Sequence, residues 1–277
     1  MTAITVLDGP LGTELNVRGV STDLPIWSAA AISEAPDVVA QIHRDYAAAG
    51  ATVHTANTFR TKRRTIGQSW RELTQAAVQL ARRSVPESHR VAGSISPLED
   101  CYRPDLSPAN PRDEHREMAE ELVAAGCDLL LCETFPHVGE AIVAVTAAVQ
   151  TGTTTWVSFT AGPNADLLSE AAISQAARQA VDAGATAVLV NCTPAIDTLR
   201  FVKAIAAANL GVPIGAYANA GSVDDKIGWR SSPDPGAEKY AQFAQQGVDA
   251  GATLIGGCCG TGPAHIAALK ALQSRLS

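Results

Sequence analysis

Residues 250–260 read AGATLIGGCCG, and related phrases begin at three other places: AGATVHTANTF at Ala49, AGCDLLLCETF at Ala125 and AGATAVLVNCTP at Ala183. In each phrase a glycine suited to ending a helix precedes a short apolar run, which is typical of a strand buried on both faces of a parallel sheet. Four further apolar runs occur at residues 3–9, 90–96, 154–162 and 212–221. The pattern predicts eight strands that alternate with helices.

Eight strand and helix pairs in 277 residues match the count and size of a (β/α)8 barrel. An open doubly wound sheet usually has fewer strands and a phosphate fingerprint, and the sequence contains neither G-x-G-x-x-G nor a Walker A motif. No linker or shift of composition interrupts the chain. We therefore expect the α/β class, with residues 1–277 forming one domain, a single (β/α)8 TIM barrel.

The composition limits the possible partners. A formal net charge of -7 disfavours nucleic acid and anionic membranes, and no apolar run is long enough to span a bilayer. We therefore expect small-molecule partners, no nucleic acid, no membrane and a cytoplasmic location. In that reducing compartment the six cysteines are expected to be buried apolar residues, metal ligands or catalytic thiols, not disulfides. The sequence gives no indication of oligomeric state.

In such barrels the functional groups lie at the carboxyl ends of the strands and in the loops that follow. Counted from the repeat glycines, four side chains stand seven positions on and two cysteines stand eight positions on: Asn57, Glu133, Asn191 and Cys258, then Cys192 and Cys259. The even-numbered strands would therefore present these groups at one level of the barrel mouth. Asp8 ends the first strand, and Asn219 ends the seventh.

Three cysteines at the barrel mouth favour a metal site. Three thiolates around one ion leave the fourth tetrahedral position open, which is typical of catalytic zinc, and thiolate ligands select zinc over magnesium or calcium. Cys258 and Cys259 would point to opposite faces of a regular strand, so the backbone must leave the pleat, and we expect Gly256, Gly257 and Gly260 to permit the unusual dihedral angles. A vicinal disulfide and three small buried apolar residues remain as alternatives.

Seven phrases carry a family resemblance over nearly the whole chain: DGPLGTEL (8–15), APDVVAQIHRDYAAAGATVHTANTF (35–59), GSISP (93–97), DLLLCETFP (128–136), VNCTP (190–194), YANAG (217–221) and IGGCCGTGPAHI (255–266). In these phrases and their order the chain resembles the homocysteine S-methyltransferase family. That family includes betaine-dependent and S-methylmethionine-dependent enzymes and the homocysteine-binding module of cobalamin-dependent methionine synthase.

The resemblance implies that Cys192, Cys258 and Cys259 hold Zn²⁺, that the thiol of L-homocysteine takes the open position, and that Asp8 and Glu133 hold the substrate's amino group. It implies an S-methyltransferase that moves a methyl group from a small donor, S-methylmethionine or another sulfonium, to homocysteine and forms methionine. Chemistry agrees with this implication, because a thiol that coordinates a metal is deprotonated without a protein base. We expect no catalytic residue beyond the zinc site.

Other positions bear on substrate and donor. We expect Asn219 to contact the substrate. Pro10 stands where the family usually has a second glycine and so lacks one N–H donor, and Ala218 stands where a proline is usual. Three long rim loops, residues 16–35, 98–112 and 222–235, carry aromatic side chains that either contact a methyl-bearing cation or close the top of the barrel: Trp27, Tyr102 and Trp229.

Two other functions remain open from the residues. A phosphate-handling barrel enzyme would use GGCCGTGP, which follows the eighth strand where such barrels often bind phosphate. A non-catalytic zinc- or thiol-binding protein would keep the cysteines but would not need Asp8 and Glu133. Metal analysis separates the first from the methyltransferase, and a homocysteine methylation assay separates the second.

Overall fold

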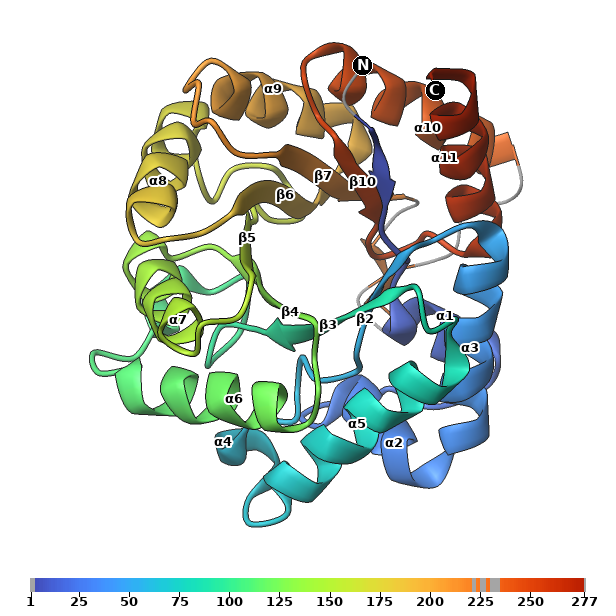
Figure 1. Cartoon of the computed structure of the whole chain (residues 1–277), viewed down its shortest axis with the longest axis vertical. Coiled ribbons are helices and arrows are strands. Elements are labelled where there is room, and N and C mark those ends of the chain that lie inside the picture. The colour runs from blue at the N-terminus through green and yellow to red at the C-terminus, as the bar shows by residue number, and fades with distance from the viewer. Residues whose placement is uncertain (1–2, 221–222, 225–227, 230–234, 277) are drawn as a thin grey trace.

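The computed structural model describes residues 3–220, 223–224, 228–229 and 235–276, and it forms a ring of parallel strands surrounded by helices (Figure 1). Eight strands lie in one sheet in the order β1-β10-β7-β6-β5-β4-β3-β2. A parallel bridge between Leu7 and Val53 joins the two edge strands and closes the ring. The predicted (β/α)8 barrel is therefore confirmed.

The barrel strands occupy the predicted segments: β1 (Thr5–Val6), β2 (Val53–Thr55), β3 (Arg90–Ile95), β4 (Leu129–Phe135), β5 (Thr155–Phe159), β6 (Ala187–Pro194), β7 (Ile214–Asn219) and β10 (Leu254–Gly257). A small antiparallel pair, β8 (Val223–Asp224) and β9 (Gly228–Trp229), follows β7. The longer helices alternate with the strands: α3 (Pro36–Ala49), α5 (Trp70–Ser84), α6 (Arg112–Ala124), α7 (Val138–Gln150), α8 (Glu170–Asp182), α9 (Ala195–Ala206), α10 (Pro235–Asp249) and α11 (Pro263–Leu276).

Shorter helices lie in the loops at the barrel mouth: α1 (Leu11–Val17), η1 (Trp27–Ala30), α2 (Ala31–Glu34), α4 (Arg63–Ile66) and η2 (Pro104–Leu106). Among the described residues, no helix combines the length and the apolar character that crossing a membrane requires.

The repeat glycines end their helices as the sequence predicts. Gly50, Gly126, Gly184 and Gly251 all have φ between 96° and 107°, a left-handed conformation that a side chain disfavours. Each glycine turns the chain from a helix into the next strand. This shared turn explains why the four phrases resemble one another and why their strands finish at the same level.

Side chains alternate between the inside and the outside of the barrel. One buried cluster contains only residues on or beside strands and so fills the interior: Leu7, Val53, Ala92, Leu129, Leu131, Trp156, Ala187, Leu189, Tyr217 and Leu254. Cys258 packs against the upper part of this cluster. Because strand side chains alternate with a period of two, Glu133 points into the barrel two residues beyond Leu131.

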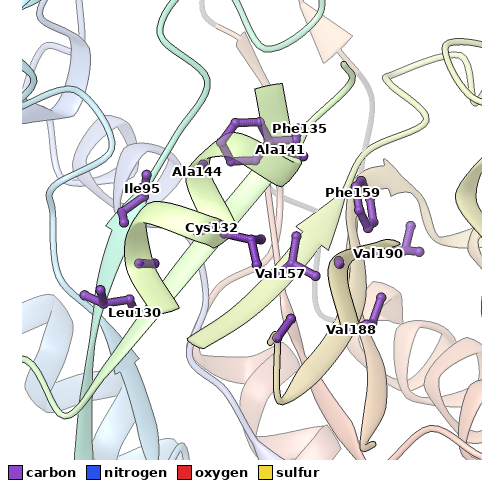
Figure 2. Packing of buried hydrophobic residues seen from close by; sticks show 14 of the residues in the cluster. Ile95, Leu130, Cys132, Phe135, Ala141, Ala144, Val157, Phe159, Val188 and Val190 are labelled. Atoms are coloured by element: carbon purple, nitrogen blue, oxygen red, sulfur yellow. The ribbon is translucent and has the colours of Figure 1, made fainter. Parts of the chain in front are cut away.

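The outward side chains pack against the helices. Figure 2 shows Leu130 and Cys132 of β4, Val157 of β5, and Ala141 and Ala144 of α7 as members of one apolar cluster. All five residues are completely buried. Cys132 is therefore part of the apolar packing between sheet and helix, as predicted for a cysteine outside the proposed metal site.

Close packing between β7 and β10 generates a testable prediction. A Cβ atom at Gly215 would lie 2.1 Å from the backbone oxygen of Leu254, which has no freedom to move aside. We expect Gly215→Ala to lower the free energy of unfolding by about 2 kcal/mol or more, as overpacking in a rigid core does. Thermal melting of purified variants measures this effect.

Gly247→Ala in α10 is the matched control. Its Cβ would meet only the Cβ of Ala252, at 3.9 Å, and alanine favours a helix by up to about 1 kcal/mol. The control should melt at or above the wild-type temperature. Equal melting temperatures for Gly215→Ala and wild type would contradict the proposed tight contact.

Candidate metal centre

Three thiols meet at the mouth of the barrel. The Sγ atom of Cys192, at the end of β6, lies 2.9 Å from Sγ of Cys258 and 3.9 Å from Sγ of Cys259, both of which follow β10. All three are unbonded cysteines, so neither the vicinal disulfide nor any other disulfide is formed among them. β7 lies between β6 and β10 in the sheet, so the thiols reach toward each other above it.

The backbone turns locally to bring these thiols together. Cys192 has φ of 50°, which is uncommon for a residue with a side chain, and the pairing of β6 with β7 shifts register between Asn191 and Pro194. By strand alternation Cys192 would point outward, and this strained conformation redirects it. Strain of this kind is typical of functional positions.

The glycines around the cysteine pair have two different roles, which corrects the sequence-based expectation. Gly260 has φ of 80° and does supply the unusual dihedral angle. Gly256 and Gly257 do not have positive φ; a Cβ at Gly256 would lie 2.7 Å from Leu7 Cβ, and one at Gly257 would lie 2.2 Å from the hydroxyl oxygen of Thr261. These two glycines are needed for space.

The cluster fits a zinc ion in donor chemistry and in size. The metal-ligating atoms of Cys192, Cys258 and Cys259 lie within 4.8 Å of one another. With Zn–S bonds of about 2.3 Å, two sulfur ligands of a tetrahedral ion are separated by about 3.8 Å. Hydrogen bonds from the neighbouring thiols, first from Cys192, hold the pKa of Cys258 well below its usual range, so the cluster stabilises a thiolate.

Tyr240 of α10 holds the strands beneath the cysteines in register. Its buried hydroxyl accepts a hydrogen bond from the N–H of Ala218 at 3.0 Å and lies 2.7 Å from the carbonyl oxygen of Gly256. The carbonyl of Ala218 in turn accepts from the N–H of Cys258 at 2.9 Å. Tyr240 could not be identified from the sequence, because a tyrosine on a helix face carries no signal of this contact.

Ala218 stands where the resemblance leads us to expect a proline, and the structure uses its backbone N–H. A proline at position 218 would have no N–H to donate to the Tyr240 hydroxyl. The hydrogen bond from Ala218 to Tyr240 therefore requires a residue other than proline at position 218.

Glu133 lies on the interior side of β4, two residues beyond Leu131. The hydroxyl of Ser94 donates to one carboxylate oxygen, and the hydroxyl of Tyr217 donates to the other at 2.9 Å. Burial raises the pKa of Glu133 to about 7, and the hydrogen bonds only partly offset this. Tyr217 was missed, although its position two residues before Asn219 on a barrel strand was the available signal.

Asp8 follows β1 and is 4% exposed. Its Oδ2 atom accepts from the N–H of Thr55 at 2.9 Å, and its backbone oxygen accepts from the N–H of Gly257 at 3.0 Å. Burial raises the pKa of Asp8 well above its usual range, and repulsion from Glu133 adds to this. Two buried carboxylates that repel each other form a region suited to a cation.

The three asparagines at strand ends differ in their contacts. Asn57 is occupied by two hydrogen bonds with Ser28, and Asn191 bonds to Thr134 and Ser158 inside the barrel. Asn219 is 2% exposed, and neither its amide nitrogen nor its amide oxygen has a hydrogen-bond partner. A buried amide without partners is costly, so Asn219 is the one of the three available to a ligand.

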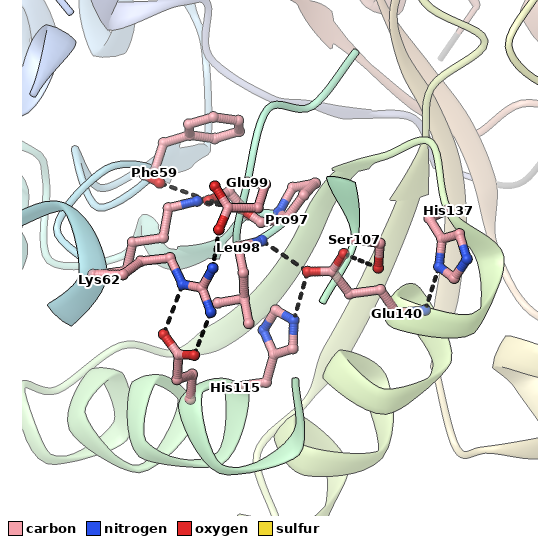
Figure 3. Close-up of polar contacts among 12 residues, drawn as sticks. Phe59, Lys62, Pro97, Leu98, Glu99, Ser107, His115, His137 and Glu140 are labelled. Carbon is pink, nitrogen blue, oxygen red and sulfur yellow. Dashed lines mark hydrogen bonds and ion pairs between the residues drawn. The ribbon is translucent and has the colours of Figure 1, made fainter. Parts of the chain in front are cut away.

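The rim loop after β3 is fixed by a buried carboxylate (Figure 3). Glu140 at the start of α7 accepts from the N–H of Leu98 at 2.7 Å and from the hydroxyl of Ser107 at 2.7 Å, and it lies 3.1 Å from Nε2 of His115. This holds residues 98–112 against α6 and α7. Burial and then the charges of the cysteine cluster raise the pKa of Tyr102, which lies in this loop.

The other predicted rim aromatics do not share this position. The Trp27 ring packs edge-on against Phe59, with ring centroids 5.9 Å apart, and a Cβ at Gly12 would lie 2.3 Å from Trp27. Trp27 therefore closes the top of the barrel. The side chain of Trp229 and residues 230–234 lie outside the described residues.

The barrel and its thiol cluster define a TIM-barrel protein with a candidate metal centre, and comparison with known proteins gives the family. A sequence model of the homocysteine S-methyltransferase family matches residues 5–272. A homocysteine S-methyltransferase of Escherichia coli (strain K12) is 32% identical, over 97% of this chain and 94% of its own length. Homocysteine S-methyltransferase YbgG of Bacillus subtilis (strain 168) is 30% identical, over 97% of this chain and 94% of its own length.

A solved structure supports the same assignment. The metallated form of the homocysteine methyltransferase MmuM from Escherichia coli superimposes with a TM-score of 0.81 and 27% identity, covering 98% of this chain and 96% of that one. The chain belongs to the homocysteine S-methyltransferase family, and it is a methyltransferase.

Tyr240 gives a prediction about metal affinity. Tyr240→Phe removes the hydroxyl that joins Ala218 and Gly256 and leaves a buried N–H without a partner. Because residues behind a metal ligand typically change metal affinity by 10- to 100-fold, we expect zinc affinity to fall by roughly tenfold or more. Competition titration with a chromogenic chelator measures it.

Tyr46→Phe is the control for Tyr240→Phe. It removes one buried hydroxyl, which donates to the Pro10 carbonyl at 3.1 Å, without touching the strands that carry the cysteines. Its zinc affinity should match the wild type. Equal losses in the two variants would mean that general loosening of the barrel, and not the Tyr240 contact, sets the affinity.

The pKa of Glu133 predicts how stability depends on pH. Because the folded-state pKa of about 7 exceeds the ordinary value of 4.5, the folded protein binds the proton more tightly, and stability is lost as pH rises from about 4.5 through 7. The loss is about 3 kcal/mol above pH 7. Glu133→Gln, which carries no charge, should therefore exceed the wild type in melting temperature at pH 8 by more than at pH 5.

Metal-free, substrate-free protein is used for both melts, so that ligand binding does not contribute to the difference. A gap that is the same at pH 5 and pH 8 would contradict the raised pKa of Glu133.

Proposed function

We propose that this chain transfers a methyl group from a small cationic donor to the thiol of L-homocysteine and forms methionine, using Zn²⁺ held by Cys192, Cys258 and Cys259. The observation that carries the proposal is the convergence of these three thiols at the mouth of the barrel. Three protein sulfurs leave one position for a fourth ligand, and a substrate thiol suits it.

Zinc bound there would lower the pKa of the substrate thiol, so that a thiolate is present at neutral pH. The chain's own task is to hold the sulfur and the donor methyl group in line. The carbon–sulfur bond to homocysteine forms as the bond from the methyl carbon to the donor sulfur breaks, and the thiol proton passes to solvent. Positioning of two bound reactants supplies much of the rate enhancement in such a displacement.

Asp8 and Glu133 are proposed to bind the amino group of homocysteine. Both carboxylates are buried, and each raises the other's need for a positive partner through repulsion. An ammonium group between them would lower the pKa of both and restore their charged state. Asn219 is proposed to bind the substrate through its amide, which has no hydrogen-bond partner among the residues that the structure describes.

The donor is proposed to be S-methylmethionine or another sulfonium. The thiolate cluster and the two carboxylates make the mouth of the barrel negative, which attracts a cation. Tyr102 lies on the rim loop that Glu140 holds, and its ring is proposed to contact the methyl-bearing cation. We take residues 1–277 as one homocysteine-binding domain that works on small molecules in the cytoplasm.

The phosphate-handling alternative has less support from the loop after β10. Phosphate sites of this kind use free backbone N–H groups. Here the N–H of Gly260 donates to the Thr13 hydroxyl at 3.1 Å, that of Thr261 donates to the Cys258 carbonyl at 3.1 Å, and that of Gly262 donates to Nδ1 of His265 at 3.2 Å. These donors are already used within the protein.

A methylation assay with the zinc-loaded chain tests the proposal. Homocysteine is offered with S-methylmethionine, S-adenosylmethionine or betaine, and methionine formation is measured together with bound zinc. We expect turnover with a sulfonium donor, and we expect Cys259→Ala to lose the zinc bound at the thiols and to lose turnover, while its circular dichroism stays native. Methionine formation by the Cys259→Ala variant without zinc at the thiols would overturn the metal's role.

Asp8→Asn is the companion variant. It leaves the three thiols intact, so the zinc bound by the thiols should stay at the wild-type level, while the KM for homocysteine should rise roughly tenfold or more through loss of a charged hydrogen bond. A wild-type chain that binds zinc and homocysteine but methylates nothing would support a non-catalytic thiol-binding protein instead.

A further inference from the structure

A second group of metal-ligating side chains lies beside the proposed substrate site. His43 comes from α3, His54 comes from β2 and Asp8 follows β1, and their ligating atoms all lie within 4.8 Å of one another. Both histidines are completely buried. By strand alternation His54 points away from the barrel interior, toward α3, so this group is separate from the thiol cluster.

His43 has two nitrogen atoms that no protein group satisfies. Among the described residues, neither Nδ1 nor Nε2 has a hydrogen-bond partner, although the ring is completely buried. Burial lowers the pKa of His43 to about 4, so the ring is neutral and one nitrogen carries a free lone pair. Buried polar groups are rarely left unpaired, and an imidazole lone pair without a donor is a ready metal ligand.

His54 has the hydrogen bonding expected of a metal ligand. Its Nε2 lies 3.0 Å from Nδ1 of His89, and the two rings are stacked with centroids 5.3 Å apart. Its Nδ1 has no hydrogen-bond partner. If Nε2 carries the proton and donates it to His89, Nδ1 presents its lone pair to the cluster, as ligating histidines do when an outer residue fixes the tautomer.

Asp8 supplies the anionic member of the group. Its Oδ2 accepts one hydrogen bond, from the N–H of Thr55, which leaves further lone pairs on the carboxylate. Asp8 is 4% exposed, whereas the two histidines are completely buried, so an ion would enter from the barrel mouth past the Asp8 side chain.

We propose that Asp8, His43 and His54 form a second divalent-metal site, distinct from the three cysteines, that binds Zn²⁺ or a similar transition-metal ion through two imidazoles and a carboxylate. The ligand set selects zinc, cobalt or nickel over magnesium and calcium, which prefer oxygen ligands. A bound ion would accept lone pairs from the unpaired nitrogens of both histidines, and it would compensate the negative charge of Asp8.

Occupation of this site has a consequence for the reaction. This consequence rests on the proposed function. If Asp8 binds the amino group of homocysteine, the second ion and the substrate compete for the carboxylate of Asp8. Each then weakens the binding of the other by the same factor. The site would make the enzyme sensitive to excess metal.

Titration of the full chain with Co²⁺ tests the site directly. Cobalt at the thiol cluster gives strong sulfur-to-metal charge-transfer absorption, whereas cobalt bound by two imidazoles and a carboxylate gives only weak visible bands. We expect the wild-type chain to bind two equivalents of Co²⁺. When zinc is used instead, elemental analysis should also count two equivalents per chain. His54→Leu should bind one, with the charge-transfer absorption intact.

The complementary variant carries Cys192→Ser, Cys258→Ser and Cys259→Ser together. It should bind one equivalent of Co²⁺ without charge-transfer absorption, and this result stands even if His54→Leu fails to fold. His89→Ala, which removes only the outer hydrogen bond, should keep the second equivalent with roughly tenfold weaker affinity. These three variants separate the two sites by stoichiometry and by spectrum, without any activity measurement.

One equivalent in the wild type, or none in the triple serine variant, would overturn the second site. A second equivalent that His54→Leu retains would place the ion elsewhere and overturn it equally. If the second equivalent is present but homocysteine does not weaken it, the site stands, and the assignment of Asp8 to the substrate fails instead.

Discussion

The approach of Cys192 to the two thiols after β10 is the constraint on which the site depends. The thiols come from strands that β7 separates, so they meet only because the chain departs from regular strand geometry at both ends. At β6 the departure is the left-handed backbone of Cys192, and after β10 it is the left-handed turn at Gly260. Tyr240 and the close contact at Gly215 hold β7 and β10 in the register that this approach requires.

Much of the fold could be predicted from the sequence because one signal repeats. A helix-ending glycine and an apolar run mark four strands, and the intervening runs mark the others, so the barrel and the level of Glu133, Cys192 and Cys258 followed from counting. Helix-borne contacts could not be predicted in the same way. Tyr240 and His43 look like ordinary helix residues in the sequence, and only the packing of α10 and α3 against strands brings them to functional groups.

The roles of the glycines show why local geometry was harder to predict. Gly256 and Gly257 were expected to permit unusual dihedral angles, yet they leave room for the side chains of Leu7 and Thr261. Leu7 is far from them in the sequence, and Thr261 follows them by a few residues. A sequence records that a side chain is absent but not whether conformation or space requires its absence. Gly260, with its positive φ, is the position at which the conformational explanation holds.

Burial of charge links stability to function in this protein. Glu133 and Asp8 have raised pKa values because they are held away from water near one another, which is unfavourable until a cation binds. Among the described residues, the amide of Asn219 at the end of β7 and the ring nitrogens of His43 on α3 are also buried without hydrogen-bond partners.

The central claim is that three protein sulfurs hold one zinc ion and leave a place for a substrate sulfur. X-ray absorption at the zinc edge, on chain loaded with one equivalent of zinc, measures the ligands directly. The account predicts three sulfur neighbours and one lighter neighbour without substrate, and four sulfur neighbours after homocysteine is added. A zinc environment with fewer than three sulfurs, or one that homocysteine leaves unchanged, would contradict it.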